Sequence, residues 1–167
     1  MKKIEPIRHA RQNELEQIME IYAAARTFMA ANGNAEQWGD GYPQKEILQE
    51  DLEKKQLYVY EEDGKIGAVF VFFIGKEPDY ETSVSGKWTS PKPYGVLHRI
   101  AVVTYGKGIA SKCIQWCYEQ CHCMRGDTGQ KNKSMQRLFE KNGFTQCTMV
   151  HLGAGEMLGY ERYEEEY

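Results

Sequence analysis

The stretch that most restricts the fold of this chain is residues 96–121, VLHRIAVVTYGKGIASKCIQWCYEQC. It begins with an apolar, β-branched run that is typical of a strand, and it passes through two glycines into a run with helical spacing. The N–H groups at the start of such a helix have no acceptor within the helix, and together with the helix dipole they attract anions. The stretch therefore predicts a strand, a turn and a helix with an anion site at the turn.

The turn has two interpretations. Gly106 and Gly108 let a diphosphate approach the backbone without a Cβ in the way, and Lys107 adds positive charge. A glycine turn before a helix also serves for simple chain reversal. The stretch lacks GxxxxGK[ST] and GxGxxG, so it is neither a P-loop nor a Rossmann fingerprint.

The rest of the chain alternates in the same way between strands and helices. A short strand at 4–10 precedes a helix at 11–33, a second helix covers 45–56, and 57–74 reads as a hairpin that turns at Asp63-Gly64. A long connection without clear period runs over 75–95. A strand at 123–128, a helix at 131–143 and two strands at 144–152 and 156–164 follow. This order predicts a mixed α/β sheet in one domain over residues 1–167.

Charge and hydropathy exclude some function classes. The net charge is −3, with 21 basic and 24 acidic residues, so the chain has no basic field to hold a nucleic acid. The longest apolar stretch, IGAVFVFFIG, is far shorter than the roughly 20 residues of a membrane span. We therefore expect a cytoplasmic protein that binds neither nucleic acid nor a membrane.

The cysteines raise the question of a metal site. Cys113, Cys117 and Cys121 recur every four residues, with His122 and Cys123 adjacent. Three thiols along one straight helix span about 12 Å, which is too far for one ion. We therefore expect reduced cysteines on a core face of the helix and no metal.

Two segments together carry a family resemblance. HRIAV, GKGIASKCIQW and then DT and NKSMQRLFEKNGF resemble the GCN5-related N-acetyltransferase (GNAT) family, in which [RQ]xxGx[GA] marks acetyl-CoA binding. QWGDGYP, YGVLHRIA and KNGF are similar to uncharacterised bacterial members. The resemblance implies a central, mostly antiparallel sheet of about seven strands with a splayed parallel pair, flanked by about four helices.

The resemblance also implies the cofactor site. Backbone N–H groups from Gly106 to Ser111 would hold the acetyl-CoA pyrophosphate, and β-segment residues Ile100 and Val102 would bind the pantetheine arm. Asn132 would face the thiol end of the cofactor. The full set of cofactor residues implied in this way is Ile100, Ala101, Val102, Tyr105, Gly106, Lys107, Gly108, Ile109, Ala110, Ser111, Asn132 and Phe139.

The sequence departs from the family at two of these positions. Tyr105 stands where Arg or Gln is usual, and Phe139 stands where a tyrosine often protonates the departing thiolate. Tyr94, Tyr105 or water would then supply that proton. His98 is the candidate general base, because imidazole exchanges protons near neutral pH. The alternative is that His98 points into the sheet or only orients the substrate.

Acidic and aromatic residues in two loops are candidates for acceptor binding. Glu36, Trp38, Asp40 and Tyr42 lie where the family places acceptor specificity, and this lining suits a cationic amine. Trp38 equally fits a cap over the core. The same two interpretations apply to Tyr80 and Trp88 in the long connection.

These observations predict an enzyme that transfers an acetyl group from acetyl-CoA to a primary amine of a small molecule or peptide by direct attack. The alternative is a catalytically weak or inactive acyl-CoA-binding sensor or scaffold of the same fold, which Phe139 favours. A plain interaction domain would not bind CoA. The sequence does not identify the acceptor, and it leaves the oligomeric state open, with a homodimer as one option.

Overall fold

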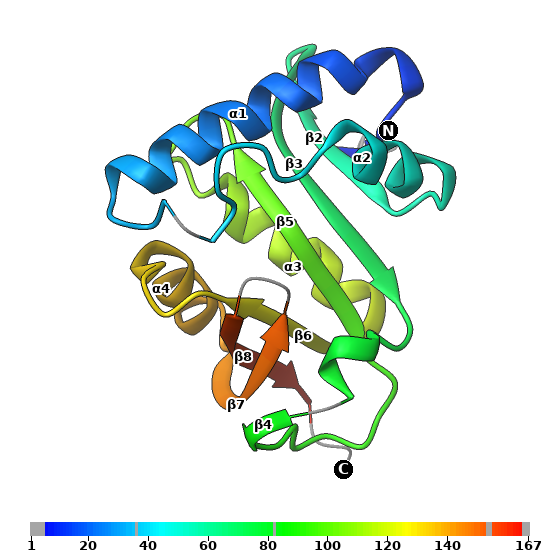
Figure 1. Ribbon diagram of the computed structural model, residues 1–167. Helices are drawn as coiled ribbons and strands as arrows, with labels where there is room; N and C mark the ends of the chain where they lie inside the picture. The colour runs from blue at the N-terminus through cyan, green and yellow to red at the C-terminus, as the bar shows by residue number, and fades with distance from the viewer. Residues whose placement is uncertain (1–5, 36, 82, 153–154, 165–167) are drawn as a thin grey trace. The chain divides into compact units, whose positions relative to one another are not determined.

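The computed structural model describes residues 6–35, 37–81, 83–152 and 155–164 (Figure 1). These residues form two compact units. The first unit contains the described residues up to Phe72 together with Arg99–Cys113, and the second contains Phe73–His98 and the described residues from Ile114 onward. The prediction of one domain over the whole chain stays a prediction.

Three strands of the first unit form a meander. β1 (Ile7–His9) pairs antiparallel with β2 (Leu57–Glu62), and β2 pairs antiparallel with β3 (Lys65–Ile74). Asp63 and Gly64 have φ angles of 54° and 75° at the tip of the hairpin. The tight turn predicted from Asp-Gly is therefore confirmed, since a primed turn needs two positive φ angles in succession.

Two helices of the first unit lie side by side (Figure 1). A single 3₁₀ turn, η1 (Gln12–Glu14), leads into α1 (Leu15–Ala31), and α2 (Lys45–Glu53) follows the intervening loop. The apolar face of α1 is buried because its members recur at helical spacing, as the sequence predicted. The buried residues of α1 are Leu15, Ile18, Ile21, Tyr22 and Ala25.

Strand β5 (Gly95–Val102) contributes its last four residues to the first unit. Just beyond its end, the Val103 N–H donates to the Gly67 carbonyl of β3 at 2.9 Å, so the backbone rejoins the hydrogen-bond ladder there. Within β5, Arg99 has a φ of 51°, which is the left-handed region. A turn then leads to α3 (Ile109–Cys121), as the sequence predicted.

The second unit contains the parallel pair. β5 pairs parallel with β6 (Cys123–Thr128), with Gly95 opposite Met124. β6 pairs antiparallel with β8 (Gly155–Tyr163), β8 with β7 (Thr145–Leu152), and β7 with the edge strand β4 (Ser83–Gly86). Helix α4 (Lys133–Lys141) connects β6 to β7. The predicted mixed sheet is confirmed, and the described residues contain eight strands rather than about seven.

One prediction for the second unit was wrong. The connection over 75–95 is not continuous loop, because it contains a 3₁₀ turn, η2 (Pro78–Tyr80), and strand β4. β4 is a four-residue edge strand, SVSG, whose pairing with β7 rests on backbone groups. Such a strand has too little apolar alternation to be recognised by period.

The cysteines are free thiols, and Cys113 and Cys117 are buried. Burial raises the pKa of Cys113 to about 12. Among the described residues, no group of three or more His, Cys, Asp or Glu side chains is arranged to hold a metal ion. No helix in the described ranges has the length and apolar character that crossing a membrane requires.

Candidate functional site

The turn between β5 and α3 is open and shaped by its glycines. Gly106 and Gly108 have φ angles of 82° and 72°, and a Cβ built at either position would have no heavy atom within 4 Å. Lys107 between them is exposed. A glycine turn at the start of a helix is an arrangement in which proteins commonly bind phosphate groups.

Tyr105 precedes the two glycines of this turn and connects the turn to α1. Its ring stacks on Phe28 of α1, with centroids 3.9 Å apart and an interplanar angle of 15°. Tyr105 is still 48% exposed. At the position where the family signature has Arg or Gln, this chain therefore has an aromatic contact that ties the turn to α1.

The strand segment before the turn alternates in burial. Ala101 is buried, whereas Ile100 and Val102 are half-buried. The sequence resemblance assigned the backbone of these residues to the pantetheine arm.

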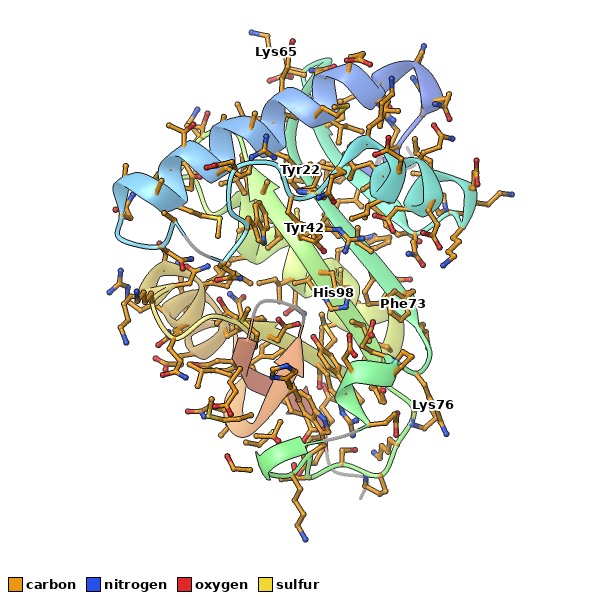
Figure 2. All side chains as sticks on the ribbon, in the orientation of Figure 1. Tyr22, Tyr42, Lys65, Phe73, Lys76 and His98 are labelled. Carbon is orange, nitrogen blue, oxygen red and sulfur yellow. The ribbon has the colours of Figure 1, made fainter. Side chains whose placement is uncertain are left out.

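Arg99 lies at the centre of a buried polar cluster in the first unit. Its guanidinium donates to Asp51 Oδ2 and, at 2.9 Å, to the Tyr42 hydroxyl, and the Tyr22 hydroxyl donates to the Arg99 carbonyl at 2.7 Å. Figure 2 labels Tyr22 and Tyr42. A left-handed φ costs a non-glycine residue of order 1–3 kcal/mol and persists only where the surroundings hold it. The three contacts provide that constraint.

His98, the neighbouring residue, belongs to a different cluster, in the second unit. Its Nε2 lies 3.2 Å from Glu77 Oε2 and its Nδ1 lies 3.6 Å from Asp127 Oδ1. The His98 ring also packs against Phe73, with centroids 6.1 Å apart (Figure 2). Each ring nitrogen therefore faces a carboxylate.

Asp127 connects this cluster to the core. It accepts a short hydrogen bond from the hydroxyl of Tyr80, which is fully buried. Burial raises the pKa of Asp127 above its ordinary value, although the nearby His98 opposes the shift. Burial and the charge of Asp127 raise the pKa of Tyr80 well above its usual range. The cluster thus contains two groups, Asp127 and Tyr80, whose surroundings favour the protonated form.

The long connection is held in place around His98. The Tyr94 hydroxyl accepts from the Glu77 N–H at 3.0 Å and donates to Glu81 Oε1 at 2.8 Å. Trp88 donates to the Tyr80 carbonyl at 2.6 Å, and its ring lies against the Arg125 guanidinium. These contacts fix the loop that carries Glu77.

The predicted acceptor residues of the first unit are arranged differently. Trp38 packs edge-on against Tyr22, with centroids 5.7 Å apart, and lies 6.4 Å from the Tyr42 ring. Asp40 is exposed. Glu36 lies outside the described residues.

Asn132 and Phe139 both lie in the second unit. The Asn132 side chain caps α4 by accepting from the Met135 N–H at 3.1 Å. Phe139 is 1% exposed and stacks on Tyr160. A Cβ on Gly126 would lie 2.6 Å from the Phe139 ring, so the ring fills the space above β6.

The sequence interpretation missed several residues that build these clusters. Glu77 and Asp127 join His98, and Tyr22, Asp51 and Arg99 form the other cluster. A signal existed for Asp127 and Arg99, because each is a charged residue within a strand that is otherwise largely buried. The other three gave no local signal.

Comparison with solved structures identifies the fold. A GNAT-family acetyltransferase from Streptococcus agalactiae has 33% sequence identity and a TM-score of 0.87, covering 96% of this chain and 95% of that chain. A Salmonella typhimurium protein solved with its cofactor acetyl-CoA has 20% identity, 96% and 94% coverage and a TM-score of 0.64. The NatC complex with Gag peptide and CoA has 14% identity, 95% and 98% coverage and a TM-score of 0.64.

The last two matches show the acetyltransferase fold. The Streptococcus agalactiae match goes further, because its identity and coverage are both high: the chain belongs to the GNAT family of acetyltransferases. No protein-family model and no curated protein matches the sequence.

Proposed function

We propose that this protein is an N-acetyltransferase that transfers an acetyl group from acetyl-CoA to a primary amine of a small molecule or peptide. The observation that carries the proposal is the open turn at 105–111, with two left-handed glycines, in a chain of the GNAT family. The free cysteines fit a cytoplasmic location, where thiols stay reduced.

The turn and the strand before it would hold the cofactor. Backbone N–H groups from Gly106 to Ser111 bind the diphosphate, and Lys107 adds charge. The backbone of Ile100 and Val102 aligns the pantetheine arm. When bound, acetyl-CoA supplies a thioester whose carbonyl carbon bonds to the amine nitrogen as the C–S bond breaks.

The amine must also lose a proton, and we propose that a Glu77 carboxylate oxygen accepts it and shares it with His98, because both ring nitrogens of His98 face carboxylates. Their hydrogen bond of 3.2 Å lets the imidazole and the carboxylate share a proton. Asp127 at the other ring nitrogen stabilises the imidazolium that results. Two carboxylates around one imidazole also attract an ammonium group electrostatically.

The departing thiolate needs a proton donor or solvent. Tyr94 already donates its hydroxyl hydrogen to Glu81, whereas Tyr105 lies in the exposed turn. We therefore assign this role to Tyr105 or water ahead of Tyr94.

In the acceptor loop, the residues that would contact the amine are Trp38, Asp40 and Tyr42. Glu36, which was also predicted to do so, lies outside the described residues. Tyr80 has no exposed surface, so in this proposal Tyr80 and Trp88 support the His98 cluster through Asp127 instead of contacting the acceptor as the sequence predicted.

One observation favours a second candidate function. Phe139 has no hydroxyl and is packed in the core of the second unit. A domain that binds acyl-CoA without turning it over, as a sensor or scaffold, would need no proton donor there.

The test measures CoA release from acetyl-CoA in the presence of a broad panel of primary amines and of peptides with a free N-terminal amine. Release that depends on an amine supports the enzyme. Acetyl-CoA binding without release for any amine supports the sensor, and absence of binding contradicts both.

A further inference from the structure

Arg99 is a residue with an unusual backbone conformation beside Ile100, which we propose binds the pantetheine arm. It has a φ of 51° inside strand β5, where an L-residue normally adopts extended φ. Such a conformation persists only where neighbouring groups determine it, and it often marks a site where backbone direction matters.

Three segments of the first unit hold Arg99 in this conformation. Tyr22 on α1 donates its hydroxyl to the Arg99 carbonyl at 2.7 Å. Asp51 on α2 pairs with the guanidinium, and its second oxygen accepts from Gln56 at 2.8 Å. Tyr42, in the loop between the helices, accepts from Nη1 at 2.9 Å. Both Tyr22 and Asp51 are buried.

The backbone consequence falls on Ile100. The Arg99 carbonyl belongs to the same peptide unit as the Ile100 N–H, so the hydrogen bond from Tyr22 fixes the direction of that N–H as well. By Val103 the chain is again bonded to Gly67 of β3. The contacts of Arg99 therefore set the orientation of the short segment between these two points.

We infer that Tyr22 and Asp51 are positioning residues, which act through Arg99 to aim the Ile100 N–H at the carbonyl oxygen of the acetyl thioester. This inference rests on the proposed function. Because Tyr42 bonds to the same guanidinium, the acceptor loop is tied to the strand that aligns the thioester.

The test removes one hydroxyl group. In Tyr22→Phe, the Ile100 peptide loses its anchor while the turn at 105–111 keeps all of its residues. We expect kcat to fall roughly tenfold, since small misplacement of reacting groups costs up to about a hundredfold. The Kd for CoA should stay within about twofold, because backbone groups of the untouched turn bind the diphosphate.

A second readout does not depend on activity. Amide hydrogen exchange in a peptide that covers residues 99–102 should accelerate about fivefold in Tyr22→Phe, as local opening becomes easier. Tyr60→Phe is the matched control, because it removes a hydroxyl that bonds to Glu62 at 2.7 Å elsewhere in the same unit. That variant should match the wild type in both readouts.

The outcomes separate the two proposals. If the wild type releases no CoA with any amine, the proposed function fails, and the exchange experiment still decides whether Tyr22 holds the strand. Unchanged amide exchange in Tyr22→Phe overturns the inference. A fall in kcat that is matched by an equal fall in CoA affinity overturns it as well. If Tyr22→Phe does not fold, Tyr42→Phe, which removes another contact of Arg99, replaces it in the exchange experiment with the same expectation.

Discussion

His98 and Arg99 are consecutive residues of β5, yet their surroundings differ in chemistry. His98 lies between two carboxylates, and one of them, Asp127, has a raised pKa. Arg99 is a permanent cation paired with one carboxylate, Asp51, whose two oxygens are both hydrogen-bonded. The first arrangement contains groups that can gain or lose a proton, whereas the guanidinium of the second stays charged.

This difference teaches that one strand can separate two tasks. A cluster of several titratable groups suits proton transfer, whereas a cluster whose charges are fixed suits holding the backbone in one conformation. Substitutions that remove a charge should therefore cost mainly stability at Arg99 and mainly activity at His98.

The largest expected effect is on stability in the Arg99 cluster. Asp51→Asn leaves a mostly buried guanidinium, 13% exposed, without its counter-ion, which costs up to about 3–5 kcal/mol of unfolding free energy. Urea denaturation measures this. Glu50→Gln on the same helix is the control, since the Glu50–Lys54 pair is exposed and should contribute little to stability. Equal losses of unfolding free energy in the two variants would show that the Asp51–Arg99 pair contributes no more than an exposed ion pair.

The next effect is on activity in the His98 cluster. Glutamine can donate to Glu77 but cannot take up a proton, so His98→Gln should lower kcat roughly a hundredfold. His9→Gln is the control, because His9 stacks on Tyr58 of β2 instead. If kcat is unchanged in His98→Gln, His98 is not part of the base.

The smallest effect is on pH dependence. Burial raises the pKa of Asp127 above 3.8, so the folded protein binds a proton that the unfolded chain releases as pH rises past that value. Stability therefore falls with rising pH up to the raised pKa, by at most about 1.4 kcal/mol per pH unit.

Asp127→Asn should remove this slope when unfolding is measured from pH 4 to pH 7. Asp79→Asn, which changes an exposed carboxylate of η2, should retain it. A slope that survives in Asp127→Asn would show that another group is responsible.

Much of the fold could be predicted from local sequence, because period and turn chemistry act over few residues. The spacing on α1, the Asp63-Gly64 turn and the glycines before α3 are of this kind. The edge strand β4 could not be predicted, since its pairing depends on a β7 strand more than 60 residues away, as in Ser83 opposite Val150.

The candidate site shows the same division. The glycine turn was predicted from its own residues. The left-handed φ of Arg99 was not, because no glycine or asparagine marks it, and Tyr22, which holds it, lies 77 positions away. Likewise Tyr80 and Asp127 are 47 positions apart, so only the folded chain reveals that they meet beside His98.

The most direct test of the account is calorimetry of CoA binding to two glycine variants. Gly106 and Gly33 both have a φ of 82° and open space where a Cβ would lie. Alanine at either position should therefore cost the same conformational strain of about 1 kcal/mol. Only Gly106→Ala places a methyl group on the backbone that we propose for the diphosphate.

We predict that the wild type binds CoA, that Gly33→Ala binds it equally well, and that Gly106→Ala binds it at least tenfold more weakly. Wild-type protein without affinity for CoA, or equal affinity in the two variants, would contradict the assignment of this turn as the cofactor site.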